Sequence, residues 1–119
     1  MNWYAAHIVM QIVLTGRNDV IAWENVVLLH APNDEDAYSK ADAIGHLSEG
    51  DSGGTMEWDG SPARMVYRGT RRLASISSPS DVNNNPSDGC EVTYMQLEFD
   101  NEEALKGFMN GDGRANLLE

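Results

Sequence analysis

The sequence has little of what would fix a protein in an oxidising compartment or a membrane. Cys90 is the only cysteine among 119 residues, so no intrachain disulfide can form, which is typical of a reducing compartment. The longest apolar run, at 8–14, is interrupted by Gln11 and is far shorter than the about 20 residues that span a bilayer. The opening residues lack the basic segment of a signal peptide. We therefore expect a cytoplasmic protein with no membrane partner.

Basic side chains are also scarce. Eight Lys and Arg residues face 19 Asp and Glu residues, which gives a formal net charge of -11. Such a charge repels phosphate backbones, so we expect no nucleic-acid partner. It fits either a basic protein partner or high solubility alone, and both readings stay open. The length and the 41% of hydrophobic residues predict a single globular domain over residues 1–119.

The first 31 residues predict a β-hairpin. Apolar residues alternate over 3–14, so a long strand has one entirely apolar face. A turn cluster at 15–19 leads to a second strand at 20–31, and so short a turn favours antiparallel pairing. If the strands pair about residues 16–18, paired residue numbers sum to about 34. The opposite face of the first strand is mixed and carries Trp3, Ala5, His7, Val9 and Val13.

A helix is predicted after the hairpin. Asn33 is a good N-cap, and three acidic residues follow it, which favours a helix from 34 to 49. Small residues on one side would let this helix lie close to a sheet: Ala37, Ala41 and Gly45, beside Ile44. The Gly- and Ser-rich stretch 50–62 predicts a loop that contains a short strand near 55–58.

The second half adds two strands and a helix. We expect strands at 64–76 and 91–99, separated by a loop at 77–89. Asp100 and Glu103 form a capping box for a second helix, and residues 112–119 are expected to be a loose tail. The expected core is Tyr4, Ile8, Met10, Ile12, Leu14, Val27, Leu29, Ile44, Leu97, Phe99, Leu105 and Phe108.

This order of elements, β-β-α-β-β-α, indicates the α+β class. We predict a two-layer sandwich, with a mostly antiparallel sheet of four to five strands and both helices on one face. The mixed face of the first strand would then need a cover. A second copy of the chain in a two-fold dimer is one explanation. The other is that the loop 50–62, with Met56 and Trp58, folds back over this face.

One motif resembles an active site. Residues 50–54 spell the nucleophile loop of chymotrypsin-like serine proteases, and His7 follows two alanines as their histidine does. That fold needs two β-barrels and about twice this length, and a motif counts only in its structural context. We therefore expect neither Ser52 nor His7 to be catalytic and predict no catalytic residue.

Metal and cofactor sites are not predicted. The available nitrogen and sulfur ligands form no closely spaced pair, and His7 and His30 lie about three residues apart along the predicted ladder. Four of the eight basic residues lie in the third strand, where Arg64, Arg68 and Arg72 share a face at period two. They could bind an anionic ligand. Alternatively, they pair with Glu24, Glu91 or Glu98 on neighbouring strands.

Several segments resemble a bacterial family, the domain of unknown function 4288. They are the opening residues 3–6, the strand 23–29 with Ala31, the helix 35–45 and residues 88–94. Cys90 stands where that family usually has threonine in an Asp-Gly-Thr-Glu-Val sequence. The resemblance implies a bacterial origin and a shared fold, and it adds no catalytic residue.

Two functions remain. The first is a non-enzymatic acidic protein-binding module of the inhibitor, immunity or adaptor type, with Trp3, His7 and Val9 in an interface. The alternative is a small enzyme or anion-binding protein that uses Arg64, Arg68 and Arg72. The charge, the small size and the mixed strand face favour the first.

Overall fold

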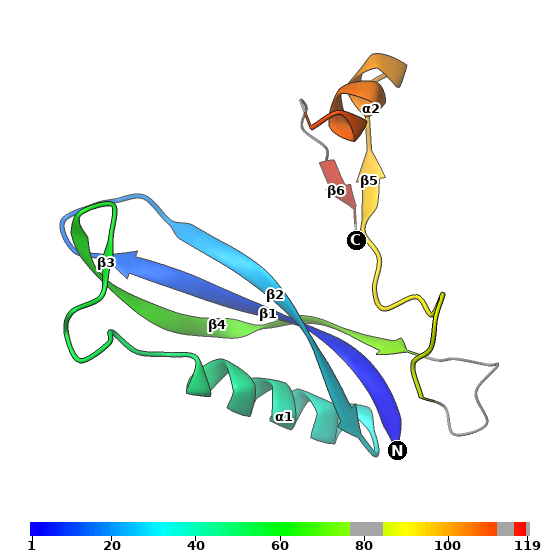
Figure 1. The fold of residues 1–119 in the computed structure, drawn as a ribbon, viewed down its shortest axis with the longest axis horizontal. Helices are drawn as coiled ribbons and strands as arrows, with labels where there is room; N and C mark the ends of the chain where they lie inside the picture. Colours follow the sequence, from blue (N-terminus) through cyan, green and yellow to red (C-terminus); the bar gives the residue numbers. More distant parts are fainter. Residues whose placement is uncertain (77–84, 112–115, 119) are drawn as a thin grey trace.

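A computed structural model describes residues 1–76 and 85–111 and, for the backbone alone, residues 116–118. It confirms an α+β fold with a four-stranded antiparallel sheet and two helices (Figure 1). The elements are β1 Asn2–Leu14, β2 Ile21–Ala31, α1 Asp34–Leu47, β3 Glu57–Trp58, β4 Ser61–Ile76, β5 Gln96–Glu98, α2 Glu102–Met109 and β6 Asn116–Leu118.

The main sheet has the strand order β2-β1-β4-β3, with the apolar β1 in the interior. β1 and β2 form the predicted hairpin, but paired residue numbers sum to 33, as in Trp3 with His30 and His7 with Val26. The predicted sum of 34 is therefore wrong by one. Because successive side chains alternate between faces, this register is the one that places Leu29 and Ala31 on the core side of β2.

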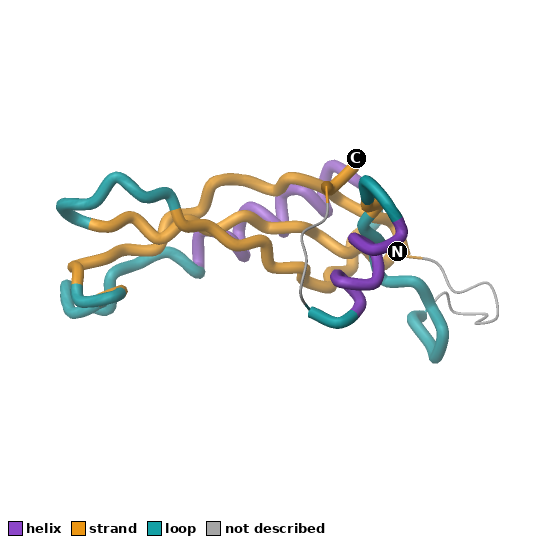
Figure 2. The backbone as a smooth tube through the Cα atoms, turned by 90° about the horizontal axis from the view of Figure 1, so that it is seen from above, coloured by secondary structure: helices purple, strands orange, loops and turns teal. Residues whose placement is uncertain are grey.

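α1 covers one face of the sheet, as its small residues predict. Asn33 caps it by accepting from the Asp36 N–H. Ala37, Ala41 and Gly45 are its buried residues, and they let its backbone approach the strands closely. Figure 2 shows α1 along one side of the strands only. The core of this side is Tyr4, Ala6, Ile8, Met10, Leu29, Ala31, Ala37 and Ala41, flanked by Val27 and Ile44.

The loop after α1 covers the far end of the same face. Met56 packs against Ile12 and Leu14. The ring centroids of Trp58 and Trp23 lie 5.8 Å apart. Trp23 is paired with Met10 of β1, which belongs to the core under α1, so Trp58 lies on the α1 side of the sheet. The hypothesis that Met56 and Trp58 cover the opposite face is therefore wrong.

β4 is irregular where it pairs with β1. Register shifts fall between His7 and Ile8 and between Val9 and Met10, and each inserts one extra residue into β4. Gly69 lies between them at φ +134, a backbone conformation that glycine adopts readily. The two bulges break the simple alternation that we assumed along the arginine-bearing strand.

The C-terminal part differs most from expectation. Instead of a strand over 91–99, only β5 forms, and it pairs with β6 rather than with the main sheet. α2 begins after the N-cap Asn101, one residue later than the predicted cap. We call β5, α2 and β6 the C-terminal arm. Figure 1 shows that it stands apart from the main sheet.

The arm also changes the predicted core. Leu97 and Phe99 are half-buried, whereas Leu105 and Phe108 are 37% and 38% exposed, so the prediction that these two are buried is wrong. The reason is that α2 packs on Phe99 of its own arm and not on the sheet. The predicted tail 112–119 contains β6 at 116–118. The predicted loop 77–89 lies partly outside the described residues, which resume at 85.

Candidate functional site

The most elaborate polar contacts lie on the sheet face opposite α1. We call it the helix-free face; on β1 it carries Trp3, Ala5, His7, Val9, Gln11 and Val13. One end is covered by the segment 85–95, which returns over the sheet after β4. Trp3 stacks on His30 at 4.2 Å and donates its indole N–H to Asn85 Oδ1. Ala5 and His7 are buried beneath this cover.

His7 joins the covering segment to the edge strand. Its Nε2 lies 2.6 Å from Thr93 Oγ1, and its Nδ1 lies 3.4 Å from Glu24 Oε1. The second contact is too poorly aligned for a hydrogen bond, so Nδ1 has no hydrogen-bond partner within the described residues. Glu24 accepts from both the Nε and the Nη2 of Arg71, the second at 3.0 Å. The group therefore links β1, β2, β4 and residue 93.

The surroundings shift the pKa values of His7 and Glu24. Burial lowers the pKa of His7, although the Glu24 carboxylate opposes that shift. The hydrogen bond from Arg71 lowers the pKa of Glu24. A neutral imidazole beside an ionised carboxylate keeps its proton on Nδ1. Nε2 then accepts from the Thr93 hydroxyl, which anchors the segment 85–95 to the sheet.

Hydroxyl, imidazole and carboxylate stand here in the order that activates a nucleophile in serine hydrolases. Two features argue for an anchor instead. The carboxylate is held by Arg71 and is misaligned with Nδ1, so it orients the imidazole poorly. The hydroxyl points at a histidine that is 2% exposed, beneath the segment that carries Thr93. The chemistry that this cluster supports best is the docking of the segment.

The three arginines proposed as an anion site have different surroundings. Arg72 donates to the Tyr94 carbonyl at 2.7 Å, and its guanidinium lies 4.0 Å from the Tyr94 ring centroid. Arg64 pairs with Val13 on the helix-free face, and Arg68 lies at the second bulge. Of the acidic partners considered from sequence, Glu24 does pair with an arginine of β4, but with Arg71. Within the described residues, Arg64 and Arg68 have no ion pair.

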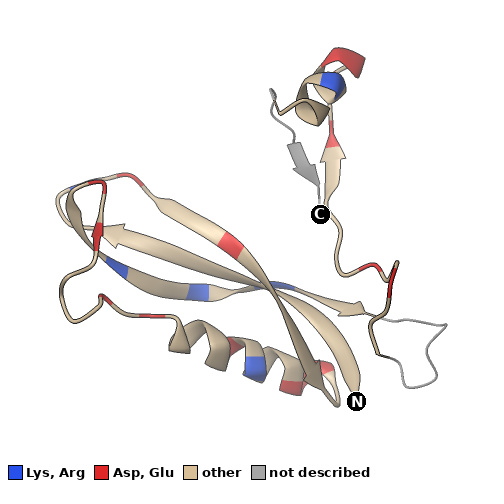
Figure 3. Cartoon of the chain, in the orientation of Figure 1, with Lys and Arg blue, Asp and Glu red and all other residues tan. Residues whose placement is uncertain are grey.

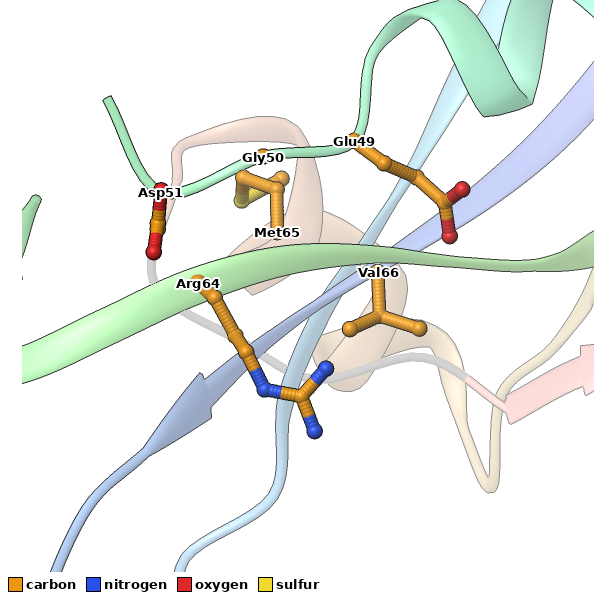
Figure 4. A pocket seen from close by; sticks show the side chains of 6 residues that line it. All are labelled: Glu49, Gly50, Asp51, Arg64, Met65 and Val66. Carbon is orange, nitrogen blue, oxygen red and sulfur yellow. The ribbon is translucent and has the colours of Figure 1, made fainter. Parts of the chain in front are cut away.

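Arg64 lines a shallow pocket between β4 and the loop after α1. The pocket holds about 320 Å³ and is lined by Glu49, Gly50, Asp51, Arg64, Met65 and Val66 (Figure 4). Arg64 and Val66 project from one side of β4, and Met65 projects from the other. Hydrogen bonds from His46 and from the Tyr67 backbone N–H lower the pKa of Glu49. Its negative charge offsets part of the attraction that Arg64 would exert on an anion.

The structure does not bring Ser52 to His7. Ser52 lies in the turn 51–54 with φ +56, and its carbonyl accepts from Thr55. Across the described ranges, no group of three or more His, Cys, Asp or Glu side chains is arranged to hold a metal ion. None of the described helices is long and apolar enough to cross a bilayer.

Sequence reasoning missed the cluster partners Thr93, Tyr94 and Arg71. Nothing in the alternation of 91–99 distinguishes a strand of the main sheet from an extended segment that lies across it. One signal could have helped. A histidine within the apolar strand β1 and an arginine-rich strand both need polar partners, and other segments of the chain have to supply them.

The family model described as a domain of unknown function, DUF4288, matches residues 3–93. The match spans the main sheet, α1 and the covering segment as far as Thr93, and it ends before the C-terminal arm. No curated protein matches the chain. No solved structure matches it either.

Proposed function

The chain belongs to the DUF4288 family, whose function is unknown, and we propose that it is a non-enzymatic protein-binding module of the inhibitor, immunity or adaptor type. One observation supports this most: the apolar side chains of α2 stay partly or largely exposed. α2 has no buried residue, and Met109 is 73% exposed beside the half-exposed Leu105 and Phe108. Exposed apolar patches on small proteins usually mark contact surfaces.

The charge of the arm indicates the chemistry of its partner. α2 and the residues just before it carry Glu98, Asp100, Glu102 and Glu103, and Lys106 is the basic residue among 96–109 (Figure 3). A partner surface that is apolar at its centre and basic at its rim would fit. We propose a protein partner in a bacterial cytoplasm, and no nucleic acid or membrane, since the net charge of -11 repels both phosphates and anionic lipids.

An affinity pull-down from the native host, read by mass spectrometry, tests this function. The bait is the full chain, and the comparison bait is Met109→Glu, which places a charge on the most exposed apolar side chain of α2. We expect a stoichiometric protein that the wild-type chain retains and the variant loses. Val20→Glu, at an exposed position in the turn before β2, is the matched control and should retain it. A protein captured equally by all three baits would contradict the arm as the binding surface.

The alternative is a small enzyme or anion-binding protein that uses Arg64, Arg68 and Arg72. Its support is the pocket beside Arg64 and the lack of an ion pair for Arg64 and Arg68 among the described residues. Calorimetric titration with phosphate and with citrate tests it. Saturable binding that Arg64→Ala abolishes would favour the alternative over the binding module.

A further inference from the structure

The chain exposes more surface than a compact monomer of its mass. Its accessible surface is 8095 Å², whereas a folded 13.1 kDa monomer exposes roughly 6,400 Å². Its radius of gyration is 17.8 Å, against about 13.5 Å for a compact chain of this length. The excess of roughly 1,700 Å² exceeds the about 800 Å² that each partner buries in a standard interface. A stable contact with another molecule can therefore be built from this surface.

A surface that complements the arm lies on the chain itself. The segment 85–95 covers only the end of the helix-free face near Trp3 and His7. At the other end, Val9, Val13 and Val66 are half-buried. We call these residues, with Arg64, Arg68 and Gly69, the bare end of the face. A hollow of about 370 Å³ lies there, lined by Val9, Arg68, Gly69, Thr70 and Arg71.

The dimensions of the two surfaces agree. Val13 lies four positions after Val9 on β1, which is about 13 Å along a strand. The eight residues of α2 extend about 12 Å. Gly69 contributes no side chain beside Val9, so an aromatic or methionine side chain of α2 could enter the hollow.

The charges are complementary as well. The arm carries Glu98, Asp100, Glu102 and Glu103 against Lys106. The bare end carries Arg64 and Arg68, which form no ion pair with any described residue. The proposed function requires a partner surface with an apolar centre and a basic rim. The bare end has both, although the chain contains only eight basic residues.

The anchored segment favours contact with another copy over contact within the chain. Thr93 and Tyr94 are held by His7 and Arg72, and only Met95 separates Tyr94 from β5. β5 then leads away from the sheet (Figure 1). The arm therefore points away from its own sheet and presents α2 to a second molecule.

We propose that α2 of one copy packs on the bare end of the helix-free face of a second copy, and that the exchange is reciprocal. A reciprocal contact closes after two copies and gives a two-fold symmetric dimer. This inference rests on the proposed function, because it identifies the partner of the same apolar side of the arm. Arg64 and Arg68 of each protomer then lie beside the acidic residues of the partner's arm.

Sedimentation analysis of the full chain at micromolar concentration is the first test. The wild-type chain sediments as a dimer. Met109→Glu and Val9→Glu each raise the dimer dissociation constant by about 30-fold or more, as expected for a central apolar contact, while far-UV circular dichroism shows an unchanged fold. Val20→Glu, on the exposed turn, leaves the dimer intact.

A paired charge reversal is the second test, and it separates this surface from others. Arg64→Glu/Arg68→Glu reverses the bare end, and Glu98→Lys/Glu102→Lys reverses the arm; Glu103 is left alone because it pairs with Lys106 at 3.6 Å. Each double variant alone opposes like charges and is monomeric. A mixture of the two restores both contacts of the reciprocal dimer and forms a heterodimer.

Each other outcome overturns the inference. If every variant stays dimeric, the dimer uses another surface, such as the open edge of β2. If the two double variants stay monomeric when mixed, the arm does not pack on a second copy. A monomeric wild-type chain that still captures a host protein, which the Met109→Glu variant loses, refutes the dimer and leaves the proposed function standing. A monomeric chain that captures none refutes both.

Discussion

Gly45 of α1 packs tightly against Tyr67 of β4, so Gly45→Ala should destabilise the fold. Gly45 lies directly over the ring of Tyr67. A Cβ built on Gly45 would stand 2.3 Å from Tyr67 Cδ1 and 2.5 Å from its Cε1, where carbon atoms in contact keep about 3.5–4.0 Å. The substitution therefore requires the ring or the helix to move by more than 1 Å.

Tyr67 cannot move freely. Its hydroxyl donates to Asp42 Oδ1 at 2.5 Å and lies 2.8 Å from Thr70 Oγ1. The edge of the ring also meets His46, with the ring centroids 5.0 Å apart. Overpacking costs about 1–3 kcal/mol, and loss of a hydrogen bond to a carboxylate adds about 1.5 kcal/mol. Alanine returns about 1 kcal/mol of helix propensity, so we expect a net loss of about 2 kcal/mol.

Thermal and urea unfolding followed by far-UV circular dichroism measure this loss. At about 4 °C per kcal/mol for a chain of this size, the melting temperature falls by about 8 °C. Ser39→Ala, at an exposed position of α1, is the matched control and should change little. In a Tyr67→Ala background the Cγ, Cδ1 and Cε1 atoms that the new Cβ would meet are gone, and Gly45→Ala should then be neutral or stabilising. A Gly45→Ala variant as stable as the wild type, or an equal loss in both backgrounds, would refute the reasoning.

Three further predictions concern the sheet and the decoy motif. Ile12→Asp, at a side chain that is 3% exposed, should abolish cooperative unfolding because a buried charge without a partner is too costly, whereas Gln11→Asp on the other face should still melt cooperatively. The pKa of His7 in the folded chain lies below its ordinary value of 6.5, so the unfolded chain binds a proton at His7 more readily. The neutral His7 therefore contributes its full share of stability above pH 6.5, and this share is lost as the pH falls through the folded pKa. Urea titrations at several pH values between 5 and 7 should show this loss in the wild type and less of it in His7→Gln. A fluorophosphonate probe should not label Ser52, and Ser52→Ala should leave partner capture unchanged; labelling that the variant removes would revive the protease motif.

The sequence predicts the main sheet and α1 well because local and long-range signals agree there. Alternation over 3–14 identifies the central strand, and its apolar face is the face that α1 covers. The cap Asn33 and the small residues at 37, 41 and 45 act as expected. Each of these signals is read within a few residues and points to the same face, which is when prediction from sequence works best.

The surroundings of the arginines could not be predicted in the same way. Period two along β4 places Arg64, Arg68 and Arg72 together only if the strand is regular. Two bulges against β1 interrupt it, and they follow from the pairing of the strands rather than from β4 alone. The two insertions cancel, so Arg64 and Arg72 still lie opposite Val13 and His7 on the helix-free face, and only Arg68 falls at a bulge. What the sequence does not show is that the segment 85–95 covers one end of this face, where Arg72 meets Tyr94, and leaves Arg68 beside the hollow at Val9.

The position of the C-terminal arm could not be predicted either, because it also depends on contacts with distant residues. The alternation at 91–99 and the amphipathic pattern of α2 indicate that these residues pack against an apolar surface, but neither pattern states which molecule supplies it. Phe108 has the sequence environment of a core residue and the exposure of a surface residue. These two facts agree if the core that it completes includes a second chain, since an interface of that kind resembles a domain core divided between two molecules. On this reasoning the stability of the arm should depend on protein concentration more strongly than that of α1, which lies on the opposite face of the sheet. As the concentration rises, hydrogen exchange should slow most at residues 102–109 and least at residues 34–47.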